Sequence, residues 1–127
     1  HVHYIPDYDE KLAYGLSVGS NAAINVPIVG LEACGTSWMK DVANLNFLIS
    51  THDGGVADAS ADSYLGVSGS TEDEELTMLY QRMEEALAAY DNDFDLEYNI
   101  GRQLQAYLPV ISGTRMLQDY LDFLFST

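Results

Sequence analysis

Cysteine is nearly absent from this 127-residue chain: Cys34 stands alone, so no disulfide within the chain can stabilise the fold. Basic residues are also scarce, since five Lys plus Arg face 20 Asp plus Glu and give a formal net charge of −15 at pH 7. Binding to a phosphate backbone requires clustered Lys and Arg. The composition therefore argues against direct binding to nucleic acid.

Long apolar runs are missing too. The longest candidates are interrupted by Pro27, Gly30 and Asn46, well short of the roughly 20 residues that a membrane-spanning helix needs. We therefore expect no membrane span. The chain starts at His1 without a charged-then-apolar signal segment, which favours a processed N-terminus and an extracellular or virion location.

The residues that are present describe a folded protein. Hydrophobic residues make up 47% of the chain and include nine Tyr and four Phe, which is a globular composition for a single domain. We predict a mainly α fold, a small helical bundle with an irregular or partly β-hairpin N-terminal third. An α+β fold is the alternative.

The N-terminal third, residues 1–35, has two competing interpretations. Apolar residues alternate along Leu12–Val18 and again from Ile24 to Ile28, which is the spacing of two strands in a hairpin. Pro27 would then confine the second strand to a sheet edge. Alternatively, both pieces are short helices that start near Asp7 and Asn21.

The middle of the chain divides into a helix and a connector. Trp38, Val42, Leu45 and Ile49 recur every three or four residues, which predicts a helix over 36–50 capped by Thr36 or Ser37. Residues 51–70 are rich in Gly, Ser, Ala and Asp. We expect a flexible connector there, with at most one short helical turn.

Residues 71–127 predict three helices. Thr71 and Glu74 form a capping box in front of a long apolar stripe. A second helix begins near Phe94, and Pro109 is expected to end it because proline lacks a backbone N–H. The last helix follows Thr114 and is strongly apolar for a chain end.

Two clusters could hold metal ions. Asp91, Asp93, Asp95 and Glu97 alternate in DNDFDLE, which resembles the opening of an EF-hand loop and implies calcium binding. The alternative is an acidic turn in which Asp91 or Asp93 caps the next helix. At the N-terminus, the amino group of His1 and the imidazole of His3 suit copper(II) or nickel(II), unless this end is merely frayed.

No local pattern of a catalytic site is present, neither G-x-S-x-G, nor H-E-x-x-H, nor a phosphate-binding glycine loop. We therefore expect a non-catalytic acidic assembly module, a structural subunit of a larger complex or virion that forms homo- or hetero-oligomers. Its candidate interface residues are aromatic and lie near both ends: Tyr4, Tyr8, Tyr14, Phe123 and Phe125.

Three other interpretations of the acidity and the carboxylates stay open. The chain could be a decoy that binds the basic groove of a nucleic-acid-binding protein through Glu72, Asp73, Glu74 and Glu75. It could bind a divalent cation, as above. The charge could also be an adaptation to concentrated salt, which screens self-repulsion.

Overall fold

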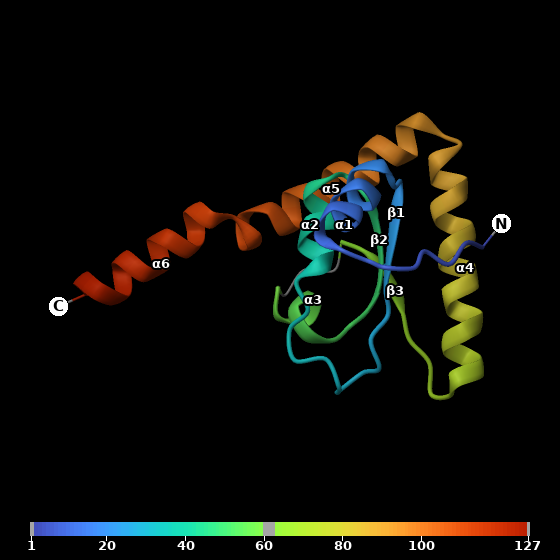
Figure 1. Cartoon of the computed structure of the whole chain (residues 1–127), viewed down its shortest axis with the longest axis horizontal. Coiled ribbons are helices and arrows are strands. Elements are labelled where there is room, and N and C mark those ends of the chain that lie inside the picture. The colour runs from blue at the N-terminus through green and yellow to red at the C-terminus, as the bar shows by residue number, and fades with distance from the viewer. Residues whose placement is uncertain (1, 60–62, 127) are drawn as a thin grey trace.

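The computed structural model describes residues 2–59 and 63–126, and for 93 and 94 it describes the backbone alone. The fold is mainly α with a small parallel sheet (Figure 1). In chain order the elements are α1 (Glu10–Gly19), β1 (Ala22–Asn25), α2 (Ser37–Ala43), β2 (Phe47–Thr51), α3 (Gly54–Asp58), β3 (Leu65–Val67), α4 (Glu72–Tyr90), α5 (Asp93–Ile111) and α6 (Gly113–Phe125).

The three strands form a parallel sheet in the order β1-β2-β3. Ala22 pairs with Phe47 and Ile49 pairs with Leu65, so β2 lies in the centre. The hairpin interpretation of residues 12–28 is wrong, because its first half lies in helix α1 and its second half, β1, pairs in parallel with β2. β1 has a strand neighbour on one side only among the described residues, but it ends at Asn25, so Pro27 lies outside the strand that it was expected to confine to an edge.

The alternation along Leu12–Val18 belongs to helix α1, as the alternative interpretation proposed. Asp9 is the N-cap, and its Oδ1 accepts the backbone N–H of Leu12 at 2.7 Å. Such a cap satisfies one of the unpaired donors of the first helical turn. The second piece is a strand and not a helix, although it is shorter than expected and ends at Asn25.

The predicted helix over 36–50 is wrong in its second half. α2 ends at Ala43, and Phe47–Thr51 form the central strand, in which every residue is buried. A strand that is buried on both faces shows a continuous apolar run and no alternation, so periodicity alone could not separate it from a helix. Thr36 does occupy the N-cap position of α2, but its side chain forms no capping hydrogen bond.

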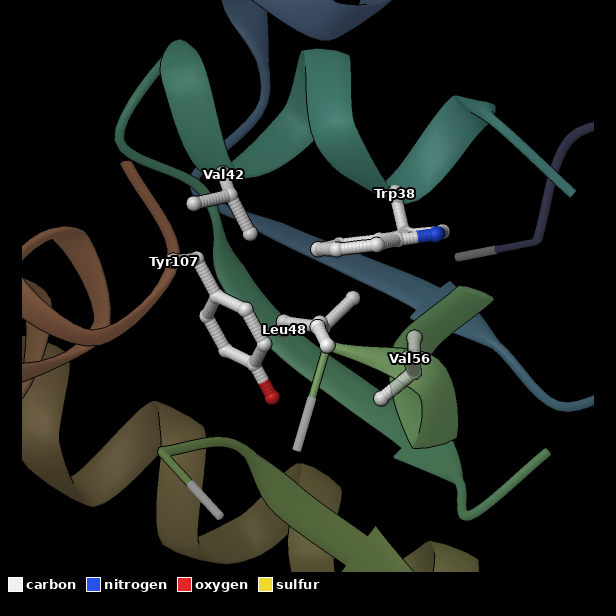
Figure 2. Packing of buried hydrophobic residues seen from close by; sticks show 6 residues of the cluster. Trp38, Val42, Leu48, Val56 and Tyr107 are labelled. Carbon is white, nitrogen blue, oxygen red and sulfur yellow. The ribbon is translucent and has the colours of Figure 1, made fainter. Parts of the chain in front are cut away.

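The core has two parts, one on each face of the sheet. On one face Leu48 packs with Trp38 and Val42 of α2, Val56 of α3 and Tyr107 of α5 (Figure 2). The rings of Trp38 and Tyr107 are arranged edge to face with their centroids 5.2 Å apart, which is a favoured aromatic geometry. On the other face Phe47, Ile49 and Val67 pack against Ala86 of α4. The sheet therefore lies between α4 on one side and α2, α3 and α5 on the other.

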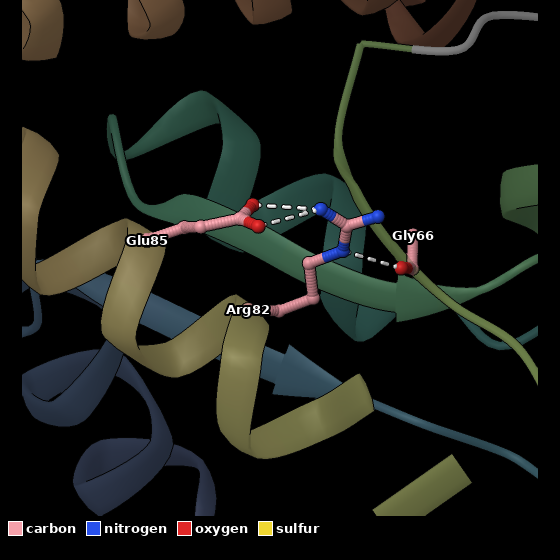
Figure 3. A network of polar contacts seen from close by, with 3 residues as sticks. All are labelled: Gly66, Arg82 and Glu85. Carbon is pink, nitrogen blue, oxygen red and sulfur yellow. Dashed lines mark hydrogen bonds and ion pairs between the residues drawn. The ribbon is translucent and has the colours of Figure 1, made fainter. Parts of the chain in front are cut away.

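The stretch expected as a connector, 51–70, contains α3 and β3, and Gly54, Gly55 and Val56 are buried. α4 follows as predicted, and the Thr71 hydroxyl accepts the N–H of Glu74. Arg82 fastens this helix to the sheet: its Nε donates to the carbonyl of Gly66 at 2.8 Å while its guanidinium pairs with Glu85 (Figure 3).

The C-terminal helices α5 and α6 run past Pro109 and away from the rest of the molecule, respectively. Pro109 does not end α5, which continues to Ile111. Pro109 removes the N–H that would donate to the carbonyl of Gln105, but the two residues after it still continue the helix. α6 projects away from the rest of the molecule and buries none of its residues (Figure 1). Among the described residues, no helix is long and apolar enough to cross a membrane.

Candidate functional site

Two connecting segments meet at the carboxyl edge of the sheet, where the parallel strands end. In open parallel sheets this edge is the usual place for ligand binding. The loop 26–36 leaves β1 and the turn 52–55 leaves β2. They are tied together by Asp53, whose Oδ2 accepts the backbone N–H of Gly30 at 2.9 Å and of Glu32 at 3.1 Å.

These hydrogen bonds change the acidity of Asp53. The backbone N–H of Glu32 lowers the pKa of the Asp53 carboxyl below its ordinary value of 3.8, with further help from the N–H groups of Gly54, Gly30 and Leu31. Hydrogen bonds to the charged form of a carboxyl favour that form. Asp53 is therefore a permanently charged anchor for the loop at neutral pH.

Two glycines allow the turn to approach this loop closely. A Cβ on Gly55 would lie 2.8 Å from both the carbonyl oxygen of Cys34 and Nε1 of Trp38. Gly54 has a backbone φ of +52°, a conformation that residues other than glycine rarely adopt. The N–H of Gly55 donates to the carbonyl of Cys34, and Trp38 Nε1 donates to the carbonyl of Gly35 at 3.1 Å. The result is a compact Gly-rich edge whose backbone is held in place.

A second candidate is the cleft between α1 and α2, with a volume of about 670 Å³. Tyrosine rings, carboxylates, an amide and one amine line it. The lining residues are Tyr8, Asp9, Glu10, Ala13, Tyr14, Ser17, Lys40 and Asn44. Clefts of this size that combine aromatic surface with a few polar groups are typical of small-molecule sites.

Lys40 gives this cleft its chemical character. The chain has two lysines, and the other, Lys11, is not part of the cleft lining. A lysine amine can pair with an anionic group, or it can form a Schiff base with a ligand that carries a carbonyl. Among the cleft residues, Lys40 is therefore the one that could pair with an anionic group of a ligand.

The predicted calcium residues lie at the α4–α5 junction. Asp91 is the C-cap of α4, and Asn92, not Asp91 or Asp93, occupies the N-cap of α5. Asn92 Nδ2 donates to Oδ2 of Asp95 at 2.7 Å. Within the described residues no group of three or more His, Cys, Asp and Glu could hold a metal ion, and the side chain of Asp93 lies outside that part. Calcium binding by Asp91, Asp93, Asp95 and Glu97 stays a prediction.

Of the three histidines, His3 and His52 lie in the described part of the chain. His1 lies outside the described residues, so the copper or nickel site with His3 stays a prediction as well. His52 follows β2, and its Nδ1 lies 2.8 Å from the hydroxyl of Tyr64. The two rings are nearly parallel, at 7°.

The aromatic residues named as interface candidates are all exposed. Tyr4 and Tyr8 lie in the N-terminal arm, while Tyr14 is on α1 and lines the cleft together with Tyr8. Phe123 and Phe125 are on the projecting helix α6. Large apolar side chains are also exposed on β1 and α4, which is more apolar surface than scattered single residues would give.

Sequence reasoning missed Asp53, the Gly54–Gly55 pair and Lys40. The sequence did carry a signal for Asp53, Gly54 and Gly55, because a Gly-Gly pair behind a short apolar run is typical of a turn at the end of a buried strand. Residues 47–51 were instead assigned mainly to a helix. Lys40 gave no signal, since it becomes part of a cleft only when α1 packs against α2.

Comparison with known proteins gives one consistent similarity. The chain is 28% identical over 145 aligned residues to glycogen phosphorylases of Mycobacterium tuberculosis and Mycobacterium bovis, in an alignment that covers 98% of this chain and 16% of each relative. It is 42% identical over 53 residues to the glycogen phosphorylase of Aquifex aeolicus, covering 42% of the chain and 8% of that protein. The chain thus spans about a sixth of the mycobacterial relatives. No family model and no solved structure matches it.

Proposed function

We propose that this chain is one segment of an enzyme of the glycogen phosphorylase type, which removes glucose units from an α-glucan by transfer to phosphate. The observation that carries the proposal is the similarity to glycogen phosphorylases over 98% of the chain. The relatives are about six times as long as the aligned segment, so we assign the reaction to a larger polypeptide and not to these 127 residues alone.

The expected role as an assembly module fits within this proposal. A segment that functions inside a larger enzyme needs surfaces to contact the rest of it, and the exposed apolar residues of α6 and the N-terminal arm supply such surfaces. That the isolated chain has no activity of its own stays a prediction. Its contribution to the enzyme is a rigid sheet with ligand-binding groups at its edges.

Within this enzyme, the cleft between α1 and α2 holds a ligand through Lys40. The amine is the basic group in a lining that otherwise supplies tyrosine rings, the carboxylates of Asp9 and Glu10, and the amide of Asn44. The carboxyl-edge loop, fixed by Asp53, continues directly into α2, which carries Lys40. The position of the amine therefore depends on the order of this loop.

The test measures phosphate-dependent release of glucose 1-phosphate from glycogen by the complete polypeptide that carries this chain. We expect activity in the parent and a loss of about 10- to 100-fold in Lys40→Ala, because a hydrogen bond to a charged group typically contributes about 1.5–3 kcal/mol. Lys11→Ala is the matched control, since it removes the other lysine, which does not line the cleft. It should retain activity within about twofold.

Two results would contradict the proposal. One is a parent protein that produces no glucose 1-phosphate at any phosphate concentration. The other is equal activity of the Lys40→Ala and Lys11→Ala variants, which would remove Lys40 from the site while leaving the enzyme class intact.

A further inference from the structure

Helices α1 and α2 both line the cleft that contains Lys40, and Ser17 ties the two helices together. The hydroxyl of Ser17 on α1 donates to Oδ1 of Asp41 on α2 at 2.8 Å. The backbone carbonyl of Ser17 accepts Nδ2 of Asn46, also at 2.8 Å. Asn46 lies in the turn between α2 and β2. Both hydrogen bonds therefore fix α1 to the segment that carries Lys40.

The three residues form a closed network. The backbone N–H of Asn46 donates to the carbonyl of Asp41 at 3.0 Å, so each of the three is bonded to the other two. Asn46 is 0% exposed, which makes it a fixed point inside the fold, whereas Ser17 and Asp41 are half-buried. A hydroxyl that donates to a carboxylate forms a charge-assisted hydrogen bond, which is stronger than one between neutral groups. We therefore expect the Ser17–Asp41 bond to contribute strongly to the position of α1.

Asp41 is the direct neighbour of Lys40 in the chain, yet it does not line the cleft. Ser17 does line it, together with Tyr14, Lys40 and Asn44. No described residue of α1 takes part in the core on either face of the sheet, so polar contacts have a large share in holding this wall. Asp41 thus acts on the cleft through Ser17 and not by contact with a ligand.

We propose that Asp41 is a positioning residue for Lys40. It holds Ser17, and with it α1, at the distance from α2 at which the amine of Lys40 and the opposite wall contact the same ligand. The inference rests on the proposed role of Lys40 in ligand binding, and it adds the group that sets the width of the cleft.

The experiment uses the complete polypeptide and inorganic phosphate, the anionic substrate of the proposed reaction. Asp41→Ala removes the acceptor, whereas Asp41→Asn removes the charge and keeps an oxygen that can accept from Ser17. Ser20→Ala is the matched control, because the hydroxyl of Ser20 donates within α1, to the carbonyl of Leu16, and Ser20 does not line the cleft. Hydrogen exchange of the α1 amides reports whether the helix is held. The kcat/KM for phosphate reports whether Lys40 is positioned.

In Asp41→Ala we expect the α1 amides to exchange about 10-fold faster and kcat/KM for phosphate to fall about 10-fold, as for the loss of one hydrogen bond to a charged group. Asp41→Asn should stay within about threefold of the parent because it keeps a neutral hydrogen bond. Ser20→Ala should do the same, since such bonds to the preceding turn add little to helix stability. The double variant Asp41→Ala/Lys40→Ala should lose no more kcat/KM than Lys40→Ala alone, because residues that act as a unit are not additive.

Three results would overturn the inference. One is additive losses in the double variant. Another is α1 exchange in Asp41→Ala that equals that of Ser20→Ala, which would show that other contacts hold the helix. The third is an Asp41→Asn variant as impaired as Asp41→Ala, because the charge and not the hydrogen bond would then be responsible.

Two further outcomes are separated by the design. If Asp41→Ala loses the circular dichroism of the fold, Ser17→Ala removes the same hydrogen bond from the other side and replaces it in the comparison. A parent without phosphorolysis contradicts the proposed function alone, because the exchange of α1 in the Asp41 variants still decides whether Asp41 holds this wall.

Discussion

The side-chain amide of Gln103 on α5 pairs with the backbone of β2 around Leu48 as a neighbouring strand would. Its Oε1 accepts the N–H of Leu48 at 2.9 Å, and its Nε2 donates to the carbonyl of Asn46 at 2.6 Å. β3 pairs with β2 only from Ile49 onward. Gln103 therefore satisfies the buried groups of β2 that lie before the point where β3 begins, and it joins α5 to the centre of the sheet.

Replacing Gln103 with leucine should destabilise the fold strongly. The side chain is 2% exposed, and its loss leaves a buried N–H and a buried carbonyl without partners. Unpaired buried groups cost about 1–3 kcal/mol each, so we expect a loss of about 3 kcal/mol in the free energy of unfolding. Urea denaturation measures it. Gln105→Leu, on the same helix but exposed, is the control, and equal effects of the two would contradict this role.

Gly55→Ala and Gly15→Ala should act in opposite directions. A Cβ on Gly55 would meet the Cys34 carbonyl and Trp38 Nε1 at 2.8 Å, and overpacking of this kind typically costs about 1–3 kcal/mol. Gly15 lies inside α1 with no atom within 4 Å of its Cβ position, so alanine should stabilise the helix by about 0.5–1 kcal/mol. Thermal unfolding of both variants tests the pair. A stabilised Gly55→Ala would show that the loop and the turn are not in close contact.

The carboxyl-edge loop should lose its anchor in acid. Because the folded-state pKa of Asp53 is lowered by the N–H of Glu32, its contribution to stability is complete above the unfolded value of 3.8 and disappears as the pH falls through the lower folded value. In Asp53→Asn this acid-dependent part should be missing. Unfolding measured in urea from pH 5 downward compares the two proteins. Parallel curves for both would contradict the anchoring role.

Salt should stabilise the folded chain. With 20 acidic and five basic residues, self-repulsion opposes the compact state, and screening at 1 M salt reduces its range to about 3 Å. Ion pairs such as Arg82–Glu85 and Arg115–Asp119 are partly exposed to solvent and contribute little against it. We expect the melting temperature to rise from low to molar potassium chloride. An unchanged or lower value would exclude salt adaptation as the reason for the acidity.

The sequence allowed the C-terminal half of the fold to be predicted because its signals are local. The capping box at Thr71 and the apolar stripe behind it depend only on residues a few positions apart, and α4 begins where they predict. The mainly α class followed from such stripes. The acidity, the missing disulfide and the absence of local catalytic motifs were likewise properties of the chain itself.

Only the tertiary structure decided that residues 47–51 are the central strand, because a strand buried on both faces has no alternation to read. The candidate sites could likewise be recognised only from the tertiary structure. Asp53 reaches Gly30 across more than 20 residues, and Lys40 lines a cleft with Tyr8 only because α1 packs against α2. Contacts between residues distant in the chain leave no periodic pattern in the sequence, so the sites depend on the fold.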